Sequence, residues 1–125
     1  RYDQLVHFIM AEVDAQGLWI HRKHEALGKV FGAFPDAVAA AKEHTLQVLA
    51  VLGGEIKRAG PYLLGESFSA ADILLVHCLD WATTIRWLGE AEGHDMQALQ
   101  EYHLRCKDRA AYRRSEEKKQ AKARM

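Results

Sequence analysis

Residues 65–81 read GESFSAADILLVHCLDW, a polar, turn-forming opening followed by a run that is apolar on almost every side. Ser69 stands where a helix N-cap is expected, and Asp72 follows three positions later. A serine at the N-cap accepts a backbone N–H of the first turn, while an acidic residue at the third helical position reaches back to the N-cap N–H. The carboxylate also meets the positive end of the helix dipole. We therefore predict that Ser69 and Asp72 form a structural N-cap, with Asp in place of the usual Glu or Gln.

The run that follows this cap has apolar side chains around the whole helix axis up to about Leu88. A helix that is apolar all round belongs at the centre of a bundle. Its polar residues, His77, Asp80 and Thr84, follow at i, i+3 and i+7, which predicts one thin polar stripe on the less buried side. A catalytic role for Asp72 would need a partner base and a cleft, and its neighbours in the sequence offer neither.

The rest of the chain also shows helical periodicity and no convincing strand pattern. We predict helices over residues 3–26, 35–59, 95–108 and 110–123, the last one mostly charged and fraying into solvent. Proline is well tolerated in a first helical turn, so Pro35 favours a helix start there. Gly17 is expected to mark a bend in the first helix, because glycine weakens helix interiors. Residues 1–125 thus form one all-α domain, a bundle of about five helices.

Composition restricts the possible partners. The 125 residues are 49% hydrophobic and hold 17 basic and 17 acidic side chains, so the formal net charge is zero. Nucleic acids and anionic membranes attract proteins with a large positive field, and we therefore expect neither as a partner. Glu116 and Glu117 interrupt the basic C-terminal segment, which favours a solvated helix end. No run of about 18 apolar residues predicts a membrane span.

The two cysteines are too few for a disulfide framework. A reducing compartment is the simplest setting for them, so we expect a cytoplasmic protein. The chain does not begin with Met and opens within a helical pattern, which leads us to expect a piece of a longer protein.

The string YLLGESFSAADILL resembles the signature of the glutathione transferase C-terminal domain, in which a Tyr-Leu-x-Gly loop and a Phe precede a Ser-x-Ala-Asp helix start. The matching residues are Tyr62, Leu63, Gly65, Phe68, Ser69, Ala71 and Asp72. The opening RYDQLVHFIMAEVDAQGLWIHRKHE resembles the first helix of this domain in bacterial-type members. The segment YHLRCKDRAAYRR resembles the closing Arg-Pro-Ala-Tyr segment of the family, with Ala110 in place of the usual proline. Three resembling segments in the right order cover nearly the whole chain.

This resemblance implies a two-domain parent enzyme that conjugates glutathione, its co-substrate, to small apolar electrophiles as a homodimer. The thioredoxin-like N-terminal domain of such enzymes binds most of the glutathione and supplies the residue that favours the thiolate. The helical domain forms a wall of the electrophile site and part of the dimer interface. Residues 1–125 correspond to the helical half alone, so we expect no catalytic residue in this chain. Because the reaction needs a thiolate at neutral pH, we expect the isolated chain to be inactive.

The resemblance also nominates three substrate-binding residues on the first helix. Asp14 lies near a position that reaches glutathione in related bacterial enzymes; the alternative is a solvated carboxylate. Trp19 is a candidate wall of the apolar site, with core packing as the alternative. Arg22 could meet a glutathione carboxylate, because guanidinium groups suit carboxylates, and otherwise it is a surface charge.

The sequence allows two other interpretations. His21 and His24 with Glu25 have helical spacing, but two imidazoles without a third ligand of known position do not make a zinc site, and we expect no metal. The resemblance extends to transferase-like helical domains that only bind other proteins, in translation factors and synthetase assemblies. An interaction module without catalysis is therefore the alternative function.

Overall fold

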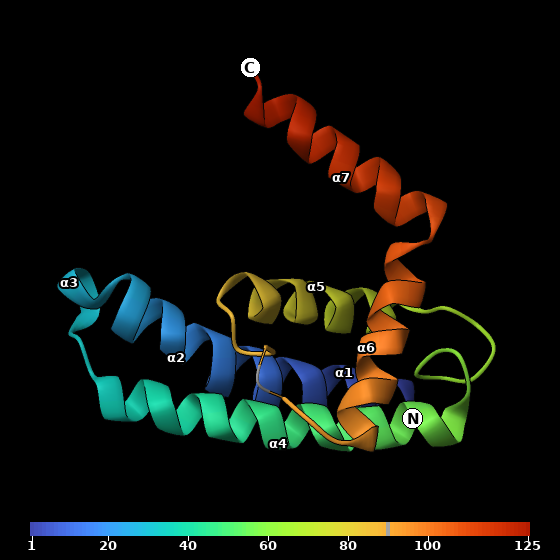
Figure 1. Cartoon of the computed structure of the whole chain (residues 1–125), viewed down its shortest axis with the longest axis horizontal. Coiled ribbons are helices and arrows are strands. Elements are labelled where there is room, and N and C mark those ends of the chain that lie inside the picture. Colours follow the sequence, from blue (N-terminus) through green and yellow to red (C-terminus); the bar gives the residue numbers. More distant parts are fainter. Residues whose placement is uncertain (90) are drawn as a thin grey trace.

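The computed structural model describes residues 1–89 and 91–125, and within them every regular element is a helix (Figure 1). The first helix is continuous and is built from α1 (Tyr2–Phe8), the π-helix η1 (Ile9–Leu18), α2 (Trp19–His21) and the π-helix η2 (Arg22–Ala26). A short α3 (Gly28–Phe31) follows. The predicted all-α fold is confirmed.

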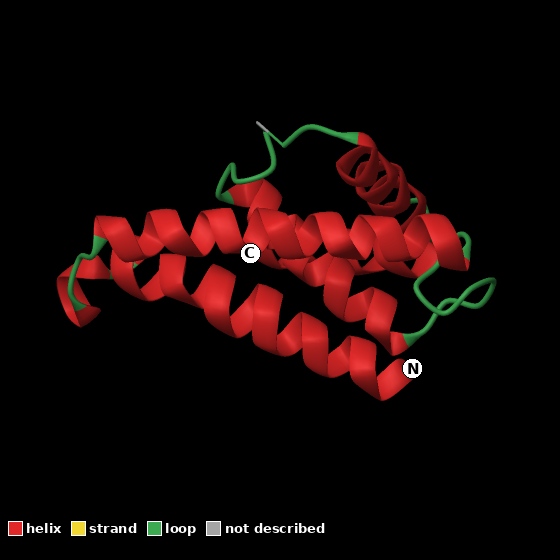
Figure 2. Cartoon of the chain, turned by 90° about the horizontal axis from the view of Figure 1, so that it is seen from below, coloured by secondary structure: helices red, strands yellow, loops and turns green. Residues whose placement is uncertain are grey.

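The first helix and α4 (Pro35–Ala59) form a long hairpin and lie side by side in two perpendicular views (Figures 1 and 2). Gly17 allows the two helices to approach closely. A Cβ at this position would lie 2.1 Å from Oγ1 of Thr45, so no larger residue fits unless the Thr45 side chain of α4 shifts. Pro35 occupies the first turn of α4, as predicted. We expected Gly17 to mark a bend, and the structure gives it a packing role.

Helix α5 (Ala70–Thr84) begins at the predicted N-cap Ser69. One side of α5 is buried in the bundle, but Ile73 is 58% exposed and His77 is also exposed. The prediction of a helix enclosed on all sides is therefore wrong, because one face of α5 lies open toward α7. The polar stripe of His77, Asp80 and Thr84 is confirmed on the less buried side.

The C-terminal end of α5 also differs from the prediction. The helix ends at Thr84, not at about Leu88, because Arg86 adopts a left-handed backbone conformation with φ of 65°. The N–H of Trp87 then bonds to the carbonyl oxygen of Ala82 at 2.9 Å, and Trp87 turns inward to only 5% exposure. A periodic run of apolar residues does not reveal this reversal, since Trp87 and Leu88 suit either arrangement.

Helices α6 (His94–Lys107) and α7 (Ala110–Ala123) complete the chain. α6 runs across α4, and a Cβ at Gly53 would lie 2.0 Å from the Asp95 carbonyl oxygen, so the two backbones nearly touch. α7 holds no buried residue and projects away from the bundle (Figure 1). Within the described residues, no helix combines the length and the apolar character that crossing a membrane requires.

Candidate functional site

The Asp72 carboxylate lies at the centre of a buried hydrogen-bond network. Its side chain is fully buried, and Oδ2 accepts the Ser69 N–H at 2.9 Å, so the predicted capping box is present. Oδ1 accepts two more hydrogen bonds, from the Leu63 N–H at 3.0 Å and from the Tyr102 hydroxyl at 2.7 Å. The carboxylate thus joins the loop before α5, the start of α5 and helix α6. Every one of these contacts stabilises the fold, and none leaves an oxygen facing a cleft.

The first helix brings Asp14 and Trp19 together through its π-helical turns. In an α-helix, residues five apart point about 140° away from each other. In η1 the backbone bonds span five residues, and the N–H of Trp19 bonds to the carbonyl oxygen of Asp14. The Trp19 side chain also lies close enough to the Asp14 carboxylate to affect its pKa. Two of the three predicted site residues are therefore direct neighbours.

Trp19 lies at the centre of an exposed aromatic and charged cluster. It is 40% exposed, so the core-packing interpretation does not hold for its whole ring. The Arg22 guanidinium lies 5.3 Å from the centre of the Trp19 ring, a cation–π distance. Trp81 of α5 meets Trp19 edge to face, with ring centres 5.5 Å apart. All three predicted residues thus share one surface.

The electrostatics of this cluster come from Asp14 and His77. Burial raises the pKa of the Asp14 carboxyl above its ordinary value, and the neighbouring His77 and Trp19 side chains partly offset that rise. The His77 ring lies 6.1 Å from the ring of Trp81, so it borders the same surface. The Asp14 carboxylate, the Arg22 guanidinium, which forms no ion pair among residues 1–89 and 91–125, and two indole rings can bind a ligand that carries both polar and apolar parts.

Sequence reasoning missed Trp81 and His77 as members of this cluster. Both lie on α5, more than fifty positions after Trp19, and helical spacing relates residues only within one helix. The sequence signal for His77 was its place in the polar stripe of α5, which predicted that its side chain lies on the less buried side of the helix.

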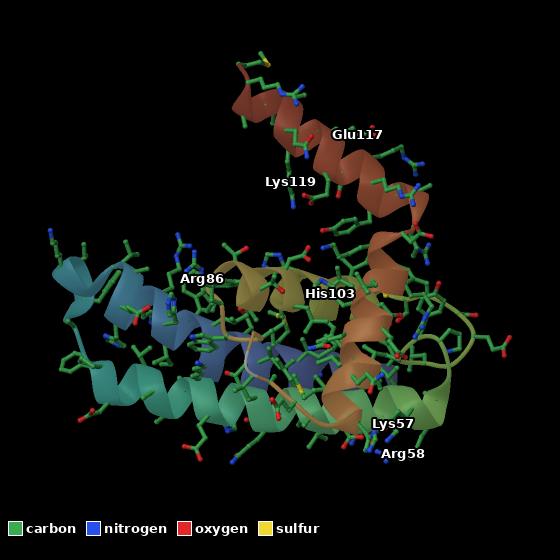
Figure 3. The ribbon with its side chains drawn as sticks, in the orientation of Figure 1. Lys57, Arg58, Arg86, His103, Glu117 and Lys119 are labelled. Carbon is green, nitrogen blue, oxygen red and sulfur yellow. The ribbon has the colours of Figure 1, made fainter. Side chains whose placement is uncertain are left out.

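A second cluster that the sequence did not reveal surrounds Asp80. Its Oδ1 lies 2.7 Å from Nε2 of His103 on α6, and its Oδ2 accepts the Tyr112 hydroxyl of α7 at 2.9 Å. Burial lowers the pKa of His103, and the neighbouring Asp80 opposes that shift. His103 lies on the side of α6 that faces α5 (Figure 3). This cluster anchors α7 to the bundle.

The histidines considered for a metal site have other partners. Nε2 of His21 lies 2.6 Å from a carboxylate oxygen of Glu25, whereas Nδ1 of His24 lies 2.9 Å from the carbonyl oxygen of Gly32. Across residues 1–89 and 91–125, no three His, Cys, Asp or Glu side chains come together as a metal site.

Both cysteines are buried and free. Burial raises the pKa of the Cys78 thiol to about 12 and that of the Cys106 thiol to about 11. Neither thiol is a nucleophile near neutral pH, because only the thiolate reacts.

Comparison with protein families gives one finding. The model of the glutathione S-transferase C-terminal domain matches residues 35–114, from the start of α4 into α7. The matched part includes the Asp72 network and Trp81, and it leaves out the first helix with Asp14, Trp19 and Arg22. The comparisons with curated proteins and with solved structures give no match. Since the matched residues make up well over half of the chain, the protein belongs to the glutathione S-transferase C-terminal domain family.

Proposed function

We propose that this chain is the helical half of a cytoplasmic, homodimeric glutathione transferase. In this proposal the parent enzyme conjugates glutathione to small apolar electrophiles. A thioredoxin-like N-terminal domain binds most of the glutathione and activates its thiol. The helical domain contributes a wall of the electrophile site and part of the dimer interface.

The observation that carries the proposal is the cluster around Trp19. A π-helical turn places Asp14 and Trp19 side by side, and Arg22 and Trp81 extend the same surface. Wide helical turns of this kind occur often at functional sites. The family assignment supplies the reaction, and the cluster supplies a surface on which its two substrates can meet.

Each member of the cluster has a chemical role in this proposal. The indole rings of Trp19 and Trp81 form an apolar wall for the electrophile, whose carbon the thiolate attacks. Arg22 makes no ion pair within the described residues, so its guanidinium is free to bind a glutathione carboxylate. Asp14 accepts a hydrogen bond from the peptide or the ammonium group of glutathione. These residues bind and orient, while the thiol loses its proton in the other domain.

The test is a comparison of four proteins in the conjugation of glutathione to a dinitro-activated aryl chloride. The full-length parent should turn over, and the isolated chain should neither turn over nor bind glutathione tightly by calorimetry. In the parent, Trp19→Ala should raise the KM for the aryl chloride several-fold. Phe31→Ala removes an exposed aromatic ring from α3, at 51% exposure against 40% for Trp19, and serves as the control. A parent without transferase activity, or an isolated chain with comparable turnover, would contradict the proposal.

One observation favours the alternative, an interaction module without catalysis. The tip of the hairpin exposes three large apolar side chains, Val30 at 72%, Phe31 at 51% and Phe34 at 54%. Exposed apolar groups that gather in one place mark interaction sites. If the parent lacks transferase activity and a Phe31→Ala, Phe34→Ala double variant loses a protein partner that the Trp19→Ala variant keeps, the module is the correct function.

A further inference from the structure

Helix α7 and the residues at its ends carry a charge opposite to that of the rest of the chain. Residues 109–125 hold seven basic and two acidic side chains, a formal net charge of +5. Because the whole chain has a net charge of zero, residues 1–108 carry a formal charge of −5. The helix holds no buried residue and projects away from the bundle (Figure 1). Its positive charge is therefore presented to solvent, apart from the negative bundle.

Three of the basic residues form a row along one side of α7. Arg114, Lys118 and Lys122 follow at i, i+4 and i+8, and all three are exposed. Residues four apart lie on neighbouring turns of an α-helix, so the charges are spaced about 6 Å apart and the row is about 12 Å long. We call these three residues the basic ridge.

The basic ridge has no acidic partner in the protein, although other cations of α7 do. The Arg113 guanidinium pairs with the Asp108 carboxylate, and Nζ of Lys119 lies 2.7 Å from the Glu116 carboxylate. Within residues 1–89 and 91–125, no ridge residue forms an ion pair or a side-chain hydrogen bond. The N–H donors of the ridge are therefore not used by the protein.

The spacing of the ridge is unfavourable for α7 itself, because like charges four residues apart repel each other on a helix. The helix dipole favours Lys122 in the last turn, but it does not explain Arg114 in the N-terminal half. Glu117 lies on the side of α7 opposite Lys119 and pairs with no ridge residue (Figure 3). A negative group from outside the chain would remove this repulsion, so the ridge is suited to binding one.

The size and surroundings of the ridge restrict the kind of partner. A nucleic acid is a long polyanion, which three cations hold weakly and which the negative bundle repels. The aromatic residue of α7, Tyr112, is hydrogen-bonded to Asp80, so no ring beside the ridge is free to stack on a base. An anionic membrane would require large apolar side chains next to the cations, and residues 113–124 contain none. A second α-helix, in contrast, can repeat the spacing of the ridge and end where it ends.

We propose that the basic ridge is a docking surface for an acidic α-helix of another protein, one that carries Asp or Glu at i, i+4 and i+8. Each carboxylate pairs with one cation, and the Arg114 guanidinium can donate two parallel hydrogen bonds to its partner. Exposed ion pairs are individually weak and are screened by salt, so the complex is transient and salt-sensitive. The ridge includes none of Asp14, Trp19 and Arg22, and the proposal does not depend on the transferase activity proposed above.

The experiment titrates the whole chain against three fluorescently labelled helical peptides of equal length and follows anisotropy. The matched peptide carries glutamate at i, i+4 and i+8, the scrambled peptide carries the same glutamates on different sides of its helix, and the neutral peptide carries glutamine instead. At about 0.01 M salt, where the Debye length is about 30 Å, we expect the matched peptide to bind at least about fivefold more tightly than the scrambled one. The neutral peptide should not bind, and about 0.15 M salt should weaken the matched peptide about tenfold. Equal binding of the matched and scrambled peptides, or no binding of the matched one at low salt, would overturn the proposal.

Two triple variants locate the contact. The ridge variant changes all three ridge residues to glutamine and should weaken the matched peptide about tenfold. The control variant removes the same number of cations from other positions along the segment: Arg113→Gln, Lys119→Gln and Arg124→Gln. The two variants have equal net charge, and circular dichroism should show equal helix content. Equal weakening in both would mean that only the overall charge of the segment matters, which contradicts a ridge-specific contact.

A nucleic acid is tested directly as the other possible occupant. A labelled single-stranded oligonucleotide of about ten nucleotides is titrated under the same conditions as the matched peptide. We expect it to bind more weakly than the peptide does. An oligonucleotide that binds more tightly than the peptide, and that the ridge variant no longer binds, would assign the ridge to nucleic acid and overturn the proposal.

Discussion

Two aspartates on the same helix, Asp72 and Asp80, make a natural comparison. Each accepts a hydrogen bond from a tyrosine of a later helix, Tyr102 for the first and Tyr112 for the second. Asp72 is fully buried and accepts two backbone N–H groups as well. The Asp80 side chain is 29% exposed, and its other partner is the ring of His103.

The two aspartates differ in the cost of leaving their hydrogen-bond donors without an acceptor. A buried donor that loses its acceptor cannot turn to water, whereas a donor at a partly exposed site can. The donors bonded to Asp72 therefore have no other acceptor within reach, whereas water can accept a hydrogen bond from the donors bonded to Asp80. Similar hydrogen bonds thus contribute very differently to stability.

The largest expected effect is that of Asp72→Ala. The substitution leaves the Leu63 N–H, the Ser69 N–H and the Tyr102 hydroxyl without an acceptor in the interior. At about 1–3 kcal/mol for each buried unsatisfied donor, with partial relaxation, we expect a loss of ~3–5 kcal/mol in the free energy of unfolding. Urea unfolding followed by circular dichroism measures it. Asp80→Ala is the matched control, with an expected loss of ~1 kcal/mol, and equal losses would abolish the distinction.

A smaller effect is expected for Tyr102→Phe. It removes one hydroxyl from the Asp72 network without opening a large cavity, so the cost is about 1–2 kcal/mol. Tyr112→Phe makes the same chemical change at Asp80 and should cost no more than about 0.5 kcal/mol, because Tyr112 is only partly buried. The same unfolding experiment ranks the two. The opposite ranking would mean that α7 contributes more to stability than its lack of buried residues indicates.

The smallest effect is a pH dependence that belongs to the Asp80 cluster. Burial, with a smaller contribution from Lys107, lowers the pKa of His103 below its ordinary value of 6.5 in spite of Asp80. The unfolded chain therefore binds a proton at this residue more readily than the folded chain does. The free energy of unfolding should fall by less than about 1 kcal/mol as pH drops below about 6.5.

His103→Gln should remove this part of the pH dependence. Unfolding of both proteins in urea between pH 5 and 8 provides the measurement. If the free energy of unfolding varies with pH in the same way in the wild type and the variant, His103 does not contribute to the pH dependence.

The sequence predicted the elements whose determinants are local. The Ser69 and Asp72 spacing located the start of α5, and Pro35 located the start of α4. The hydrogen bond from Tyr102 to Asp72 could not be predicted, because it joins residues thirty positions apart whose contact depends on how α6 crosses the bundle. The contacts of Asp80 with His103 and Tyr112 could not be predicted either, because they also depend on how separate helices pack.

The candidate site was predictable only in part. Asp14, Trp19 and Arg22 came from resemblance, and their mutual contact depends on π-helical turns that a period of 3.6 residues does not anticipate. Gly17 shows a related limit. Its low helix propensity suggested a bend, but the structure explains a glycine there by the close approach of Thr45 on another helix.

The buried thiols have a consequence for the chemistry proposed for this family member. Electrophiles that react with glutathione also alkylate protein cysteines, and they do so through the thiolate. With pKa values of about 12 and about 11, Cys78 and Cys106 hold at most about one thiolate in ten thousand at neutral pH. In the function proposed above, the domain would therefore meet reactive electrophiles without offering them a thiolate of its own.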